Sequence, residues 1–83
     1  IPLTNLVINA DSKFLAVSTV DNNILIWDIE KNQKYGELQA PNTSITDLAF
    51  SPKFTNLLIS ISYNSISMWE IQSLQEMIQN KEL

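Results

Sequence analysis

Residues 23 to 29 read Asn-Ile-Leu-Ile-Trp-Asp-Ile, and the same pattern returns at residues 65 to 71 as Ser-Ile-Ser-Met-Trp-Glu-Ile. In each stretch a tryptophan and an acid close a run rich in aliphatic residues. Trp27 and Trp69 are 42 residues apart, an interval typical of proteins built from similar β-sheets repeated along the chain. The pattern therefore predicts two equivalent β-rich units.

The first unit is expected to contain four short strands separated by turn-forming residues. Asp21, Asn22 and Asn23 supply a hairpin turn, because Asn and Asp tolerate positive φ. In the next loop, Asn32 or Gly36 is expected to adopt the left-handed conformation. The expected strands are residues 4–10, 14–20, 23–29 and 35–39.

The third strand of this unit is apolar on both faces. Alternation places Ile24, Ile26 and Asp28 on one face and Leu25, Trp27 and Ile29 on the other. A strand with two apolar faces fits a sheet that is covered on both sides by neighbouring sheets. We therefore expect both tryptophans to be buried between sheets, rather than exposed as anchors for a partner.

The second unit repeats the order after a connection that contains Pro41, which cannot donate to a strand ladder. Its last strand is ambiguous, because residues 71, 74, 77 and 78 are apolar at spacings that also suit an amphipathic helix. We expect a strand over 74–78, with a helix as the open alternative. The expected strands are 45–50, 57–62, 65–71 and 73–78, which gives repeats at 3–41 and 42–80 and a tail at 81–83.

Composition excludes several classes of function. The 83 residues are 45% hydrophobic and 17% charged, with a net charge of -4 and five basic residues, all lysine. This balance disfavours direct binding of nucleic acid. The chain has no Cys and no His, so it lacks thiolate nucleophiles, imidazole bases and the preferred zinc ligands. We expect no catalytic residues, no cofactor and no metal, and no run approaches the ~20 apolar residues that span a membrane.

Three acidic residues are candidates for a catalytic or metal site. Asp21 could be a metal ligand or a general acid, but its place in a turn explains it, and no second carboxylate stands at a suitable spacing. Asp28 and Glu70 could form a pair for glycoside hydrolysis, yet equivalent positions of two repeats carry the same residue type for reasons of fold. Residues 42–44, Asn-Thr-Ser, match the glycosylation acceptor pattern, and we interpret this match as a coincidence.

Three segments carry a family resemblance. Leu-Ala-Phe-Ser-Pro at 48–52, Leu-Leu-Ile-Ser at 57–60 and the Trp-Glu pair at 69–70 resemble a WD40 repeat, and the first unit resembles one too. The resemblance covers residues 3–78. It implies an all-β fold of two consecutive four-stranded antiparallel blades of a β-propeller, a fold whose common role is to hold other macromolecules.

In the family, a His, a Ser or Thr, an Asp and the Trp of each unit form a hydrogen-bonded tetrad. The His is missing from both units here, and Ala40-Pro41 stands where Gly-His would be. We therefore expect these divergent blades to rely on packing more than on buried polar networks. The resemblance assigns the remaining repeat positions to Thr19, Asp21, Trp27 and Asp28 in the first unit and to Ser62, Asn64, Trp69 and Glu70 in the second.

The expected function is a non-catalytic scaffold, part of a longer intracellular protein in a large complex. Its partners would be other protein subunits and the remaining blades. The turns at 11–13, 21–23, 40–44 and 53–56 are expected to form partner surfaces. Residues 45–71 are similar to late blades of WD40 proteins in the small-subunit processome, which implies ribosome biogenesis in the nucleolus. Vesicle-coat, chromatin and ubiquitin-ligase adaptor complexes, with a cytoplasmic location for some, remain alternatives.

Two readings from other classes stay open. In a propeller enzyme, Asn5, Asn9 and Asp47 would be the candidates to line a central site. In a free-standing small β protein, the chain alone would melt cooperatively. Two sheets would leave broad apolar faces uncovered, so we expect the isolated segment to aggregate or to remain disordered.

Overall fold

The computed structural model describes residues 2–40, 44–63 and 65–82, with side chains described for 2–40, 44–63 and 65–75. Its eight strands form two antiparallel four-stranded sheets, each in chain order. The predicted fold of two consecutive four-stranded sheets is therefore confirmed. The first sheet contains β1 (Leu3–Ile8), β2 (Phe14–Thr19), β3 (Asn23–Asp28) and β4 (Gln33–Gln39), and the second contains β5 (Ile45–Phe50), β6 (Leu57–Ser62), β7 (Ser65–Glu70) and β8 (Gln75–Glu82).

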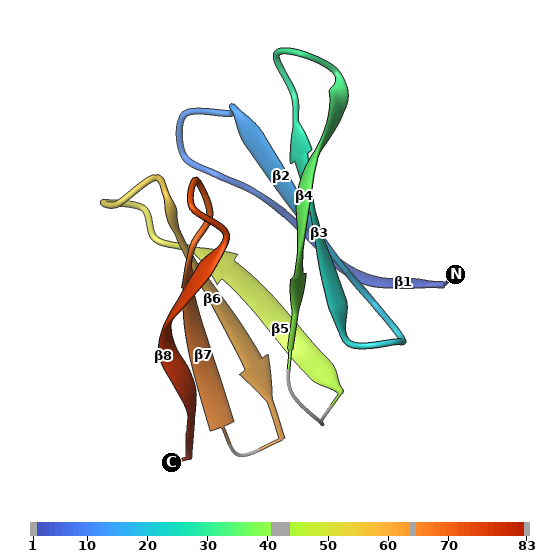
Figure 1. Ribbon diagram of the computed structural model, residues 1–83, viewed down its shortest axis with the longest axis vertical. Helices are drawn as coiled ribbons and strands as arrows, with labels where there is room; N and C mark the ends of the chain where they lie inside the picture. The colour runs from blue at the N-terminus through green and yellow to red at the C-terminus, as the bar shows by residue number, and fades with distance from the viewer. Residues whose placement is uncertain (1, 41–43, 64, 83) are drawn as a thin grey trace.

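The two sheets lie side by side, with β1 of the first nearest to β5 of the second (Figure 1). In each sheet the chain runs up and down, so the β1–β2 and β3–β4 turns share one end and the β2–β3 turn lies at the other. The same alternation places the β5–β6 and β7–β8 turns of the second sheet together. We call the end that carries these four turns the upper rim, as it is drawn in Figure 1.

Strand bounds follow the predicted ones to within two residues at β1, which ends at Ile8 rather than at residue 10, and within one residue at β2, β3, β5, β6 and β7. The last strand of each sheet differs from its prediction as follows. β4 begins at Gln33, two residues before the predicted start, because Gln33 and Lys34 pair with Asp28 and Trp27 beyond a bulge. β8 is a strand that extends to Glu82, so the helical alternative is wrong. The reason is local: Leu74, directly before β8, adopts a left-handed φ of 58°, which a right-handed helix over 71–78 would not contain.

Each turn of the first sheet contains one left-handed residue, and Ser12 holds this position in the β1–β2 turn with φ 60°. Asn22 in the β2–β3 turn has φ 66°, and Asn32 in the β3–β4 turn has φ 53°. Gly36 keeps a negative φ within β4, so of the two predicted candidates only Asn32 is left-handed. Leu74 is the repeat equivalent of Asn32, where a leucine accepts a conformation that asparagine tolerates more easily.

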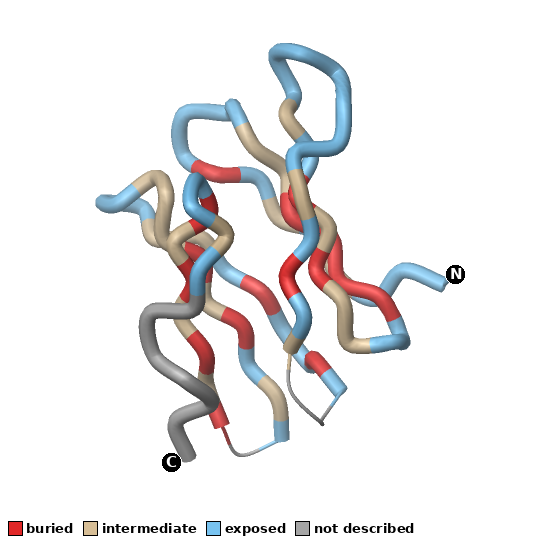
Figure 2. Tube along the Cα trace, viewed as in Figure 1, coloured by how far each residue is buried: buried red, intermediate tan, exposed pale blue. Residues whose placement is uncertain are grey.

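The core lies between the two sheets. Strand pairing places Ala16 opposite Ile26 and Ile24 opposite Leu38, so these side chains share one face of the first sheet. That face packs against the second sheet in one apolar cluster, and Figure 2 shows buried residues on strands of both sheets. The buried members of the cluster are Ala16, Ile24, Ile26, Leu38, Ile45, Leu48, Leu58, Trp69 and Ile71.

Replacing Leu58 by alanine tests this core. Leu58 has no exposed surface, so the truncation leaves a cavity and should lower the free energy of unfolding by about 2–5 kcal/mol. Leu3→Ala is the matched control, because Leu3 is 63% exposed and its truncation should change stability by about 0.5 kcal/mol or less. Denaturant unfolding of the intact protein measures both, and equal costs would contradict the packing described.

Candidate functional site

The β1–β2 turn on the upper rim is held by the buried side chain of Asn9. Its Oδ1 accepts hydrogen bonds from the amides of Lys13 and Phe14, each at 2.9 Å. Its Nδ2 donates to the carbonyl oxygen of Thr55 in the second sheet at 3.2 Å. Asn9 is only 3% exposed, so this one carboxamide both closes a turn and joins the two sheets.

In the second sheet, the side chain of Ser51 closes the β5–β6 turn. Its Oγ accepts hydrogen bonds from the amides of Lys53 at 3.2 Å and Phe54 at 3.0 Å. Asn9 and Ser51 each follow the first strand of their sheet, so the two turns use the same device with different side chains. The longer Asn side chain reaches the other sheet as well.

A second polar bridge between the sheets comes from Tyr35 on β4. Its hydroxyl donates to the carbonyl oxygen of Gln72 at 2.6 Å, and its ring meets Phe14 edge-on with the ring centroids 5.1 Å apart. Leu74 of the neighbouring turn packs on Gly36, where an added Cβ would collide with its side chain. The upper rim is thus tied together by bonds from both sheets.

The two acids that follow the tryptophans each bond within their own turn. Asp28 Oδ1 accepts from the amide of Lys31 at 3.0 Å. The Glu70 carboxylate accepts from the amides of Gln72 at 3.0 Å and Ser73 at 3.1 Å. Their structural role is to cap the turn after the third strand of each sheet, which gives no support to a paired-carboxylate catalytic site.

The turn geometry changes the proton affinity of Glu70. Desolvation at the turn raises its pKa, but the hydrogen bonds from Gln72 and Ser73 lower it by more, so the pKa lies below the ordinary value of 4.5. The carboxylate is therefore ionised at neutral pH. An ionised carboxylate is the stronger acceptor for the two amides.

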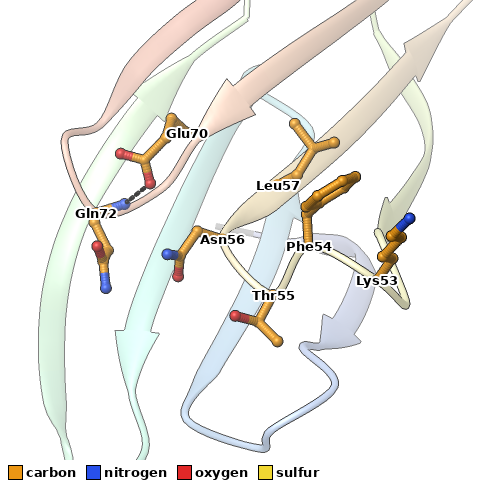
Figure 3. Close-up of a pocket in the computed structure, with 7 residues that line it drawn as sticks. All are labelled: Lys53, Phe54, Thr55, Asn56, Leu57, Glu70 and Gln72. Carbon is orange, nitrogen blue, oxygen red and sulfur yellow. Dashed lines mark hydrogen bonds between the residues drawn. The ribbon is translucent and has the colours of Figure 1, made fainter.

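A shallow pocket of about 640 Å³ opens on the upper rim of the second sheet (Figure 3). Figure 3 shows Phe54 and Leu57 at its centre, with Glu70 and Gln72 on one side and Lys53 on the other. The Lys53 ammonium lies 5.6 Å from the centre of the Phe54 ring, and Phe54 is 59% exposed. The seven lining residues are Lys53, Phe54, Thr55, Asn56, Leu57, Glu70 and Gln72.

The described residues provide little that could support chemistry. No group of three or more His, Cys, Asp and Glu among them could hold a metal ion. The residues expected to line the central site of an enzyme make structural hydrogen bonds instead. The Asn9 side chain closes the β1–β2 turn, and Oδ1 of the exposed Asp47 accepts from the amide of Leu48 at 2.9 Å. Asn5 lies half-buried on β1. No helix in the described part of the chain could cross a membrane.

Residues 2–28, which include β1 to β3, match the family described as WD domain, G-beta repeat. The second sheet repeats the same strand order and carries the Trp-acid pair at the same place. The first sheet thus carries a WD40 repeat. The two sheets of the chain are consecutive WD40 blades, as the resemblance implied.

Known WD40 proteins support this assignment. An uncharacterized WD repeat-containing protein of Schizosaccharomyces pombe is 29% identical over 65 residues, which cover 77% of this chain and 15% of that protein. The crystal structure of RRP9 WD40 repeats matches 98% of this chain and 26% of its own, with a TM-score of 0.83 and 23% identity. The Cps50 (Swd1) propeller of Myceliophteria thermophila matches 89% of this chain and 24% of its own, with a TM-score of 0.78 and 27% identity. The chain thus spans about a quarter or less of these relatives.

The WD40 tryptophan of the second blade is buried and hydrogen-bonded. Trp69 is 4% exposed, and its Nε1 donates to Ser60 Oγ at 3.0 Å. The resemblance assigned this position to Ser62, whose hydroxyl instead bonds Ser65 Oγ at 2.8 Å. Trp69 pairs with Leu58 across the hairpin, and Ser60, two residues further along β6, lies on the same face. Asn64 lies outside the described residues.

The tryptophan of the first blade is more exposed than that of the second. Trp27 is 38% exposed, so the expectation that it would be buried between sheets does not hold within the described chain. The reason is that its face meets no other sheet there, whereas the first blade covers the equivalent face of the second. Thr19 is buried and its Oγ1 accepts from the amide of Asp21 at 3.3 Å, while Asp21 itself is exposed.

Sequence reasoning missed the polar contacts that join the blades. Asn9 was noted only as a possible site residue, and Tyr35 and Ser60 were not singled out at all. Asn9 at the end of a strand is a typical turn former, and that signal identifies the turn but not the bond to the other sheet. A bond between residues 46 positions apart depends on how the sheets are placed in space.

Asn9→Ala tests the turn and the bridge together. The substitution leaves the amides of Lys13 and Phe14 and the carbonyl of Thr55 without their partner, which should cost about 1–3 kcal/mol of unfolding free energy. Asn9→Asp keeps an acceptor but loses the Nδ2 donor, so we expect an intermediate stability at neutral pH. Asn5→Ala on the same strand is the control, measured in the same denaturant titration. A cost for Asn9→Ala no greater than for Asn5→Ala would contradict the bridge.

The pH dependence of stability tests Glu70. Because its folded-state pKa is lowered, its contribution is present above the unfolded-state pKa and is lost as pH falls through the folded value. Glu70→Gln should therefore destabilise the protein at pH 7, and the difference from wild type should shrink below about pH 4. Glu30→Gln is the matched control, since the Glu30 carboxylate accepts no hydrogen bond among the described residues. A difference that does not change with pH would contradict the role of the charge.

Proposed function

We propose that this chain is a non-catalytic segment of a β-propeller scaffold that holds protein subunits together in a large intracellular complex. The packing of two complete WD40 blades into one apolar cluster is the observation that supports this most directly. The carboxylates of Asp28 and Glu70 accept hydrogen bonds within their own turns, so these two acids hold structure. On such a rigid framework, the rim loops are the parts that can bind a partner.

The partner surface we propose is the upper rim of the second blade. Phe54 projects there with 59% of its surface exposed, next to Leu57 and between the charged groups of Lys53 and Glu70. An exposed aromatic residue flanked by a positive and a negative side chain is typical of contact residues between proteins. An apolar side chain of a protein subunit would fill the pocket, while Asn56 and Gln72 offer carboxamides to its backbone.

For the assembly itself, we propose the small-subunit processome and a nucleolar location. The proposal is based on the resemblance of residues 45–71 to late blades of processome WD40 proteins. Structural similarity at or below 27% identity extends to RRP9, to a chain of the mitotic checkpoint complex and to Swd1, and it supports the fold common to them. Affinity purification of the intact protein separates the alternatives: co-purified nucleolar proteins and pre-ribosomal RNA support the processome, and coat, chromatin or ligase subunits contradict it.

Substituting Phe54 by serine in the intact protein tests the rim. If the pocket seats a partner side chain, Phe54→Ser should lower the yield of co-purified subunits by about tenfold, the effect of losing more than 1 kcal/mol at a central contact. Tyr63→Ser is the control, because Tyr63 is 94% exposed and lies on the opposite rim. Unchanged yield for Phe54→Ser, or a loss only for Tyr63→Ser, would contradict the proposed surface.

A further inference from the structure

A second hollow, of about 420 Å³, lies on the upper rim where the ends of β1 and β5 meet. Its walls come from both blades. Val7 and Ala10 belong to the first blade, and residues 50–52 belong to the second. Among the described residues that line it, only Ser51 is polar and none is charged. Val7 and Phe50 also pack against the shared apolar cluster, so this hollow, which we call the inter-blade hollow, borders the core.

The β5–β6 turn joins the inter-blade hollow to the pocket around Phe54. Residues 51 and 52 line the hollow, and residues 53–56 line the pocket. Ser51 closes this turn by accepting hydrogen bonds from two of its amides, and the carbonyl oxygen of Thr55 accepts from Asn9 of the first blade. The two apolar recesses therefore keep a fixed position relative to each other. A chain that crosses the turn can place one apolar side chain in each.

Lys53 is the charged group of this surface that has unused bonding capacity. A lysine ammonium offers three donors, and that of Lys53 lies over the Phe54 ring but makes no hydrogen bond or ion pair within the described residues. Glu70 is the other charged residue that lines the pocket. It is half-buried, and each of its two oxygens already accepts a backbone amide of its own turn. The exposed group left to bind a partner is a cation, so the surface is complementary to a carboxylate.

We propose that this rim binds an extended acidic peptide segment of a protein subunit, which crosses the β5–β6 turn and pairs a carboxylate with Lys53. One apolar side chain of the segment enters the inter-blade hollow, and another enters the Phe54 pocket. Alternate side chains of an extended chain point to the same face, so the sequence that fits has the acid two residues away from each apolar residue. This inference rests on the proposed partner surface and specifies the chemistry of the partner.

The Phe54 ring prepares the ammonium for this role. An ammonium over an aromatic face is held by the ring quadrupole, so less side-chain freedom is lost when a carboxylate pairs with it. The apolar recesses on both sides of the turn would exclude water around the pair once they are filled. A charge pair shielded from water in this way is stronger than an open surface pair.

Selection from a random peptide library displayed on phage, with the intact protein as bait, tests the chemistry of the partner. We expect the enriched peptides to carry Asp or Glu between two apolar residues. Lys53→Glu should reverse the preference, so that Lys or Arg replaces the acid. Lys31→Glu is the matched control, because Lys31 lies in the β3–β4 turn of the same rim and lines neither recess. Enrichment of no peptide, or of peptides without the acid, would overturn the proposal, and so would the same reversal in Lys31→Glu.

Fluorescence anisotropy of the most enriched peptide then tests the two recesses. Lys53→Glu and Ala10→Trp should each weaken binding about tenfold, the second because a large side chain occupies the inter-blade hollow. Ala10 is exposed, and the melting temperature checks that both variants fold. Binding that requires Phe54 but is unchanged in Lys53→Glu and Ala10→Trp would overturn this inference and leave the proposed surface standing. Failure of the proposed surface is instead seen as an unchanged yield of subunits with Phe54→Ser, so the two failures are distinguishable.

Discussion

The structure depends on the burial of one apolar sheet face against another. Four aliphatic side chains have no exposed surface, although both sheets are only four strands wide. They are Ile24 and Ile26 of the first blade and Leu58 and Ile71 of the second. Each such side chain contributes roughly 1.5–3 kcal/mol when it leaves water. Neither sheet could obtain this burial alone, because one four-stranded sheet has nothing to cover its face. Turns, caps and rim bonds then fix how the two faces meet.

Polar contacts give this non-directional attraction a defined geometry. Asn9 and Tyr35 each bond a carbonyl oxygen of the other blade, and both lie towards the upper rim. Side chains there close their own turns and also set the distance between the sheets. The same rim carries the Phe54 pocket, so its loops are presented on a well-braced framework. This arrangement suits a surface that must keep one shape while it holds a partner.

Much of the fold could be predicted from the sequence because its determinants are local. Alternation of apolar residues fixed the bounds of β5 and β6, and the Trp-acid pairs fixed the repeat. The exposure of Trp27 could not be predicted in this way, since it depends on which sheet covers each face. The choice of Ser60 over Ser62 depends on the register of a hairpin whose turn is shorter than that of the first unit. Of the candidate site, the turns were predicted, but the pocket and the bonds between blades required the placement of the sheets.

The central claim, that the two blades share one core, is tested most directly by a double-mutant cycle across the interface. Ile26 of the first blade and Trp69 of the second belong to the same buried cluster, so Ile26→Ala and Trp69→Ala should not act independently. The account predicts a coupling free energy of about 0.5–3 kcal/mol in the unfolding of the intact protein. Costs that add to within about 0.3 kcal/mol would show that the two side chains do not sense each other. That result would contradict the packing on which the rest of the structure depends.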